Sequence, residues 1–123
     1  MEQGALGKVY TDGETIIRQG EVGDRMFVVQ EGKARVTREV DGRAVHIATL
    51  KAGDIFGEMA IFEKAPRSAT VTAEGSVTVL SIDKAGFLRR VHEDPSLAYR
   101  ILQQLSRRIR DANEEIARHK LSS

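Results

Sequence analysis

The sequence contains no cysteine, and this excludes thiol catalysis, thiolate zinc sites and disulfide frameworks. It has only three histidines, at positions 46, 92 and 119, which are too few and too scattered for a metal enzyme built on a histidine cluster. No apolar run approaches the roughly 20 residues of a membrane span. The first residues lack the basic region and apolar stretch of a secretory signal. We therefore expect a cytoplasmic protein with no metal site and no membrane partner.

A strong net charge is also missing, since nineteen Lys and Arg face eighteen Asp and Glu in a chain of 123 residues. This balance is not typical of a protein that coats a polyanion. The total of +1 combines −3 from residues 1–83 with +4 from residues 84–123. Ten of the eleven glycines also precede residue 84. We expect a turn-rich β part followed by a helical part, within a single domain over residues 1–123.

Short β-prone runs separated by turn residues fill the first part of the chain. Asp41-Gly42 lies between two of these runs and is typical of a two-residue hairpin turn. Seven or eight short strands at close spacing predict a sandwich, a barrel or a jelly roll. The runs are Lys8–Tyr10, Thr15–Arg18, Met26–Glu31, Ala34–Val40, Ala44–Leu50, Asp54–Phe56, Ser68–Ala73 and Ser76–Ile82.

Two helices are predicted after the β part. The first covers residues 84–92 with Asp83 as its N-cap, and the second covers residues 96–120 after Asp94-Pro95. Arginines on the second helix are diluted by acidic residues, which favours a solvated face over a nucleic-acid surface. One apolar stripe follows this helix, so it either covers the β part or forms the seam of a homodimer. The stripe consists of Leu97, Ile101, Leu105, Ile109, Ala112 and Ile116.

Residues 56–71 interrupt the strand pattern and hold the groups best suited to bind a ligand. Glu58–Phe62 follows Gly57 without a turn residue, which predicts a short helical turn whose first amides are unpaired donors. Arg67 should face the same hollow from the start of a strand, and a planar guanidinium matches two phosphate oxygens. An acceptor, a cation and a set of amides suit a sugar phosphate. An internal ion pair between Glu58 and Arg67 explains the same spacing.

The segment FGEMAIFEKAPRSATV at residues 56–71 resembles the phosphate-binding cassette of the cyclic nucleotide-binding domain. This domain occurs in catabolite-activator-type transcription factors, kinase regulatory subunits and gated channels. Segments 14–24, 26–32 and 50–54 are similar to further motifs of the family, so that the resemblance covers residues 8–120. It implies a mainly β fold with α, in which an eight-stranded jelly-roll barrel (β-roll) over residues 8–83 carries a short cassette helix and is followed by C-terminal helices.

The resemblance also implies the residues that contact a ligand. Glu58 would bind the ribose 2′-hydroxyl and Arg67 the cyclic phosphate. On the last helix, Arg108 is a candidate contact to Glu58 or the phosphate and Asn113 to the base, although both also suit solvated helix positions. The cradle would be completed by the amides of Gly57, Met59, Ala60 and Ala69 and the hydroxyl of Ser68, with Val71 lining the pocket and Ile47 and Phe56 as weaker apolar candidates.

The implied function is that of a cyclic nucleotide sensor, a regulatory module without catalysis or cofactor. The resemblance favours cAMP over cGMP as the ligand and leaves both open. The module would move its C-terminal helices to signal to an effector protein that the sequence does not identify. Ser68 is intermediate between the Thr that accompanies cGMP preference in the family and the Ala that accompanies cAMP preference. Two alternatives stay open: a ligand-free dimerisation or docking module of the same fold, and the sensor of a larger regulator, since no helix-turn-helix follows before Ser123. A cupin-like metal enzyme is disfavoured because His46 is the only histidine in the β part.

Overall fold

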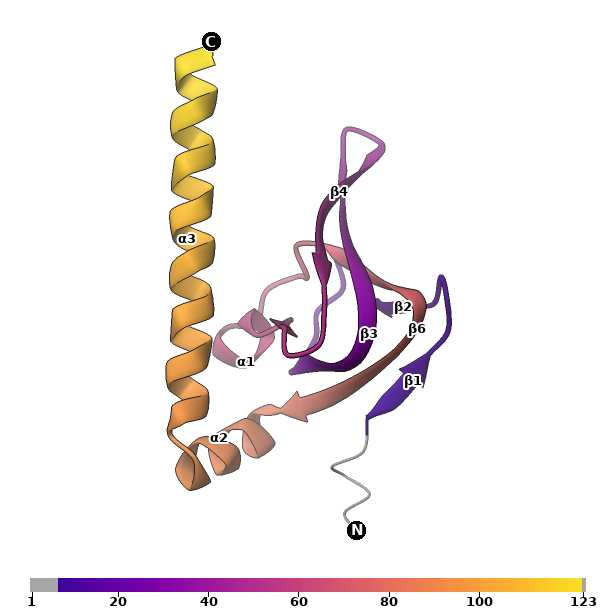
Figure 1. The fold of residues 1–123 in the computed structure, drawn as a ribbon, viewed down its shortest axis with the longest axis vertical. Helices are drawn as coiled ribbons and strands as arrows, with labels where there is room; N and C mark the ends of the chain where they lie inside the picture. Colours follow the sequence, from indigo (N-terminus) through magenta and orange to yellow (C-terminus); the bar gives the residue numbers. More distant parts are fainter. Residues whose placement is uncertain (1–6, 123) are drawn as a thin grey trace. The chain divides into compact units, whose positions relative to one another are not determined.

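The computed structural model describes the backbone of residues 7–122 and the side chains of residues 7–118, so that residues 1–6 and 123 of the predicted 1–123 domain lie outside the description. The chain divides into two compact units, one up to residue 84 and one from residue 85 (Figure 1). The first unit contains strands β1 (Lys8–Tyr10), β2 (Thr15–Ile17), β3 (Arg25–Val40), β4 (Arg43–Leu50), β5 (Ile55–Phe56) and β6 (Thr70–Asp83), and helix α1 (Met59–Phe62). Helix α2 (Lys84–Glu93) begins at the last residue of the first unit. Helix α3 (Ser96–Ser122) follows in the second unit.

All six strands belong to one antiparallel sheet in the order β1-β6-β3-β4, in which β2 also pairs with β6 and β5 with β3. The two long strands, β3 and β6, form its centre and pair from Arg25 with Asp83 to Thr37 with Thr70. Within the described residues the sheet is open, since its pairing order ends at β1 and β4. The mainly β architecture with C-terminal helices is therefore confirmed, whereas the closed barrel of eight strands is not what the pairing forms.

Eight predicted runs correspond to six strands because two pairs of runs are continuous. Gly32 and Gly75 were expected to end strands but lie inside β3 and β6, with φ angles of 89° and 71°. Glycine adopts positive φ without steric cost, so a long strand can bend there while its ladder continues. The register between β3 and β6 shifts on both sides of Glu31, next to one of these bends. The joined runs are Met26–Glu31 with Ala34–Val40, and Ser68–Ala73 with Ser76–Ile82.

The predicted hairpin turn at Asp41-Gly42 is confirmed. Both residues have positive φ, 53° and 80°, and Val40 pairs with Arg43 across the turn. Positive φ at both central positions is the geometry that matches the twist of the flanking strands. Further along the hairpin the register shifts, since Val36 pairs with Ala48 while the next residue of β3 pairs with His46. The residue between these partners on β4 is Ile47, which therefore lies in a bulge.

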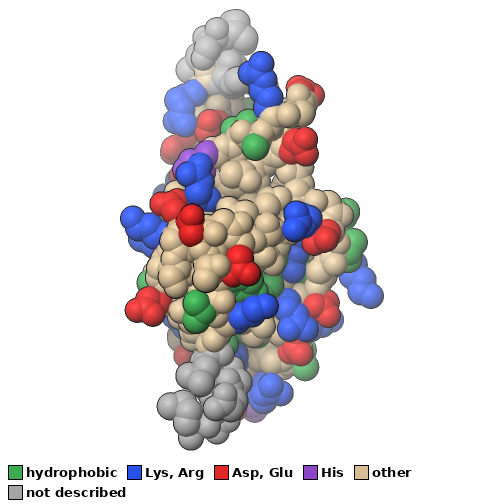
Figure 2. Space-filling model, turned by 90° about the vertical axis from the view of Figure 1, so that its right-hand side faces the viewer, with side chains coloured by type: hydrophobic (Ala, Val, Ile, Leu, Met, Phe, Trp, Pro, Cys, Tyr) green, Lys and Arg blue, Asp and Glu red, His purple; other side chains and the backbone are tan. Residues whose placement is uncertain are grey.

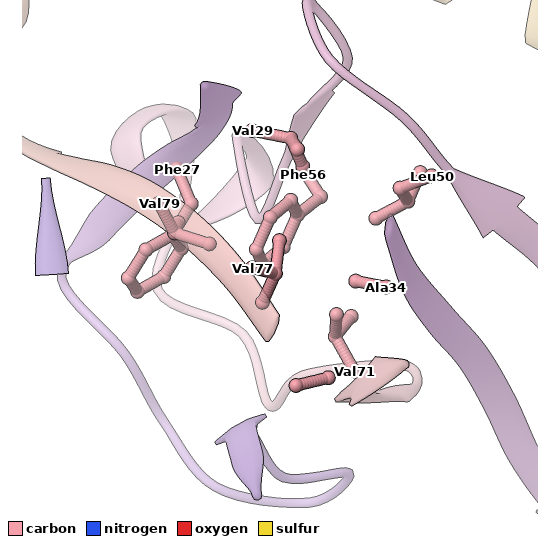
Figure 3. Packing of buried hydrophobic residues seen from close by; sticks show 9 residues of the cluster. Phe27, Val29, Ala34, Leu50, Phe56, Val71, Val77 and Val79 are labelled. Atoms are coloured by element: carbon pink, nitrogen blue, oxygen red, sulfur yellow. The ribbon is translucent and has the colours of Figure 1, made fainter. Parts of the chain in front are cut away.

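The core of the first unit is one cluster of buried apolar side chains contributed by four strands (Figure 3). Within it the rings of Phe27 and Phe56 are stacked, with centroids 5.1 Å apart and planes at 14°. They meet because the two residues are cross-strand partners in β3 and β5. Phe56 immediately precedes the cassette glycine, so core packing fixes the point where the cassette begins. The cluster consists of Phe27, Val29, Ala34, Leu50, Phe56, Val71, Ala73, Val77 and Val79.

The second unit is helical, as predicted, and α3 begins at a capped turn. Asp94 Oδ1 accepts hydrogen bonds from the hydroxyl of Ser96 at 2.6 Å and from its backbone N–H at 3.1 Å. These bonds, the hydroxyl bond foremost, hold the pKa of Asp94 below its ordinary value. The predicted apolar stripe of α3 divides, since Ile101 is buried while Ile109 and Ile116 are exposed. No helix in the described part of the chain is long and apolar enough to cross a membrane.

Replacing Leu50 by Ala should lower the free energy of unfolding by about 2–5 kcal/mol, because this buried side chain fills part of the core cluster. Denaturant titration of the purified protein measures the change. Val45→Ala, on the exposed part of the same strand, is the matched control and should change stability by less than about 0.5 kcal/mol. Equal losses for the two variants would contradict the assigned core.

Candidate ligand-binding site

The backbone of Arg67 is held by the loop that precedes β3. The Arg67 N–H donates to the Glu21 carbonyl at 2.8 Å, and the Gly20 N–H donates to the Arg67 carbonyl at 2.9 Å. Beside this pair, Val22 and Pro66 form an isolated antiparallel bridge. Arg67 was expected at the start of a strand, and it lies in this paired segment three residues before β6 begins. Two stretches more than forty residues apart in sequence therefore fix where the arginine side chain starts.

The guanidinium of Arg67 is half-buried and has well-defined neighbours. Its Nη1 donates to the Gly57 carbonyl at 3.1 Å, its Nη2 donates to the Arg25 carbonyl at 3.0 Å, and its Cζ lies 5.7 Å from the centroid of the Phe27 ring. Burial disfavours the charged form and lowers the pKa of Arg67 below its ordinary value, while the charges of Asp24 and Glu58 act in the opposite direction. An arginine remains protonated under these conditions, so the site presents a fixed cation.

Two glycines make room for this cation. A Cβ built on Gly57 would lie 2.7 Å from Nη1 of Arg67, and one built on Gly23 would overlap the guanidinium. Gly57 also has a φ of 74°, which a side chain would strain, whereas Gly23 has no positive φ. Gly57 was predicted to let backbone approach a ligand, and in this structure the group that approaches it is the Arg67 side chain.

Glu58 follows Gly57 and immediately precedes α1. Only 3% of its surface is exposed, and it is the buried charged side chain of the described residues. Its carboxylate lies close enough to the guanidinium for its charge to raise the pKa of Arg67. The acceptor and the cation predicted from the sequence are therefore brought together, both next to Gly57.

The predicted amide donors are partly engaged within the cassette. The Ala60 N–H donates to the Gly57 carbonyl at 3.2 Å, so this oxygen accepts from both Ala60 and Arg67. The side chain of Met59 is exposed, and only its backbone amide was predicted to contact the ligand. Ser68, next to Arg67, is exposed, and Ala69 is partly buried.

The remaining candidates lie in the core, on β4 and on α3. Val71 and Phe56 belong to the core cluster, with exposures of 2% and 4%, and Ile47 is on the surface of β4 with 54% exposed. Arg108 and Asn113 belong to α3 in the second unit, where both are exposed. The cassette residues all belong to the first unit.

Three neighbours of the guanidinium were missed as site residues. Gly23 and Phe27 lie in segments recognised as a loop and a strand, but no pattern along the chain indicates that they contact a residue forty positions later. Arg25 contributes its carbonyl, a group that every residue has, and so it leaves no signal in the sequence. Its own side chain instead pairs with Asp24, with Nε and Oδ1 3.1 Å apart.

Neither the distribution of charged side chains nor that of potential metal ligands indicates a second binding site among the described residues. Figure 2 shows basic and acidic side chains interspersed over one face of the molecule, without a large patch of one sign. Among the described residues there is no group of three or more His, Asp or Glu side chains arranged to hold a metal ion.

A mainly β unit with a buried glutamate and a half-buried arginine around one glycine, followed by two helices, is the architecture of a ligand-binding regulatory domain. The chain belongs to the cyclic nucleotide-binding domain family, whose model matches residues 7–94. This match includes the whole cassette.

Similar proteins agree with this assignment. The chain is 31% identical over 106 residues to the CRP-like cAMP-activated global transcriptional regulator of Mycobacterium tuberculosis, covering 85% of this chain and 47% of that protein. Its structure resembles that of the Thermus thermophilus catabolite activator protein, with a TM-score of 0.81, 30% identity, and 89% and 52% of the two chains covered. It also resembles the regulatory domain of Toxoplasma gondii PKA crystallised with cAMP, with a TM-score of 0.66, 33% identity, and 81% and 40% covered. The chain thus spans about half the length of these relatives or less.

Gly23→Ala tests whether the Arg67 guanidinium packs directly against the backbone of Gly23. The new methyl group should displace the end of a flexible side chain and cost about 1 kcal/mol of stability through the weakened carbonyl hydrogen bonds. In an Arg67→Ala background the same change should cost nothing, because the guanidinium is gone. Denaturant titration of all four proteins closes the double-mutant cycle. Additive costs would contradict the contact.

Proposed function

We propose that this chain is a cyclic nucleotide sensor, a regulatory module that is not itself an enzyme and binds cAMP in preference to cGMP. The observation that carries the proposal is the convergence of Glu58 and Arg67 beside Gly57, in a chain of the cyclic nucleotide-binding domain family. The similar proteins described above support cAMP, since one is named as cAMP-activated and another was crystallised with cAMP. A cytoplasmic location is part of the proposal, as is the absence of a cofactor.

Arg67 can stay anchored and still bind an anion. A guanidinium has five N–H donors, and the hydrogen bonds to the Gly57 and Arg25 carbonyls use two of them. The others are left for a cyclic phosphate, whose single negative charge one arginine balances without a metal ion. Both carbonyls are neutral, so they orient the guanidinium without cancelling its charge.

The other contacts follow from the positions of the cassette residues. Glu58 would accept a hydrogen bond from the ribose 2′-hydroxyl, and the exposed Ser68 hydroxyl would donate to the phosphate. The Ala60 amide would exchange its bond to the Gly57 carbonyl for one to the ligand. The amides of Gly57, Met59 and Ala69 and the apolar side chains of Val71, Phe56 and Ile47 complete the proposed site.

Signalling would occur by a shift in the populations of two placements of the C-terminal helices. The proposed hinge is the segment at residues 92–95, where α2 ends and the Asp94 cap starts α3. In the ligand-bound placement, Arg108 would contact Glu58 or the phosphate and Asn113 the base. The alternatives, a ligand-free docking module or the sensor of a larger regulator with an effector outside this chain, share the fold but differ in their response to ligand.

A homodimer through α3 is the proposed assembly. Three exposed apolar residues, Leu102, Ile109 and Ile116, are spaced seven apart along the helix. Leu105 and Ala112 lie between them in steps of three and four, which gives the a and d positions of a heptad pattern. Ile109 and Ile116 at a, with Leu105 at d, match the pattern that favours two parallel helices. The occupant of this face would be α3 of a second copy.

Arg67→Ala should weaken cAMP binding by about 2–5 kcal/mol, because truncating a charge partner leaves the phosphate uncompensated. Isothermal titration calorimetry measures the loss, and Glu58→Gln should cost less. The matched control is Arg38→Ala, an exposed arginine on β3 outside the cassette, which should leave the affinity unchanged. An Arg67→Ala protein with wild-type affinity would place the ligand elsewhere.

Ile109→Asp should convert the proposed dimer to monomers, because it places two charges opposite each other in the centre of the seam. Sedimentation velocity of the wild-type and variant proteins measures the change. Arg107→Asp introduces the same charged side chain at an exposed position of α3 outside the a and d pattern, so this control should remain dimeric. A wild-type protein that stays monomeric at high micromolar concentration would exclude this assembly.

A further inference from the structure

We propose that Phe27 is a positioning residue for ligand binding, whose aromatic face holds the guanidinium of Arg67 in place for the anion. This inference rests on the proposed function, because it names what orients the phosphate-binding arginine. Phe27 lies on β3 in the core and is not one of the residues that sequence motifs assign to the ligand.

The contact has the geometry of a cation–π interaction. The Arg67 Cζ lies over the Phe27 ring at 5.7 Å from its centroid, within the roughly 6 Å over which a ring face attracts a cation. The ring is 7% exposed, so little water competes with it. Attraction to a ring face grows when the pair is removed from water.

The ring itself is held in place by the core. It stacks on Phe56 at 5.1 Å, and the two residues are cross-strand partners, so the strand pairing determines the orientation of the ring. Tilting Phe27 away would break this stack. The rigid core therefore fixes the apolar surface, the Phe27 ring, on which the guanidinium packs.

We call the surroundings of the guanidinium the arginine seat: the Phe27 ring, the Arg25 carbonyl, and the glycines at 23 and 57. A Cβ on Gly57 would lie 2.7 Å from Arg67 Nη1 and 3.3 Å from Phe27 Cδ1, so the bare Gly57 backbone adjoins both the ring and the cation. The carbonyls fix two donor directions within the guanidinium plane, and the ring blocks displacement of the guanidinium toward its face. These neighbours are uncharged and restrain the cation, and the counter-charges that act on it come from Asp24 and Glu58.

The sharpest test keeps the shape of Phe27 and changes its electrostatics. Replacing it with 4-fluoro-, 3,5-difluoro- and 3,4,5-trifluorophenylalanine progressively weakens the negative potential of the ring face. Calorimetric affinity for cAMP should fall stepwise, by on the order of threefold to tenfold for the trifluoro variant. The same series at Phe87, a phenylalanine of α2 that is 8% exposed and outside the proposed site, should stay within about twofold, since the cation lies over the Phe27 ring.

A second measurement examines the unliganded protein and is independent of cAMP. The Nε–H proton of Arg67 should show an upfield ring-current shift in its NMR spectrum. The shift should disappear in Phe27→Leu and return in Phe27→Tyr, with thermal unfolding confirming that each variant is folded.

The outcomes separate this inference from the proposed function. If fluorination at Phe27 leaves cAMP affinity unchanged while Arg67→Ala abolishes it, the inference is overturned and the function stands. A missing ring-current shift overturns the inference in the same way. If the wild-type protein binds no cyclic nucleotide, the proposed function fails, and with it the role of Phe27 in binding, whatever the NMR spectrum shows of the contact.

Discussion

The half-buried guanidinium of Arg67 is the constraint around which the candidate site of the β unit is arranged. A cation withdrawn from bulk water needs compensating partners, and here they include the carbonyls of Gly57 and Arg25 and the face of Phe27. These partners lie in separate segments of the sequence. The antiparallel pairing of β3 with β5 and β6, together with the bridge at Pro66, brings them to one place. The site is thus a consequence of sheet topology rather than of the cassette alone.

The core and the site are physically continuous. Phe27 and Phe56 stack inside the core, Phe56 is followed by Gly57, and the positive φ of this glycine turns the chain so that Glu58 is buried next to the arginine. Apolar burial of about 25 cal/mol per Å² stabilises the stack, and the same packing fixes where the cassette starts. This link explains how a four-residue helix, too short to be stable by itself, can hold its position.

Much of the fold was predictable because its signals are local. The Asp41-Gly42 turn, the cassette helix and both C-terminal helices follow from turn chemistry and periodicity. The predicted number of strands was wrong because the chain bends at Gly32 and Gly75 inside strands, and a sequence does not distinguish a bend from a turn. Glu58 and Arg67 were singled out from their residue types, their spacing and the family resemblance, whereas the contact with Phe27 depends on tertiary structure that one-dimensional spacing does not contain.

The central claim is that this site holds the cyclic phosphate of a nucleotide. Calorimetric titration of the wild-type protein with cAMP, alongside cGMP and the open-chain 5′-AMP, tests it most directly. One site per chain should bind cAMP most tightly, and cAMP at one hundred times its dissociation constant should stabilise the fold by about 2.7 kcal/mol. The absence of binding to cAMP, or equal affinity for 5′-AMP, would contradict the account.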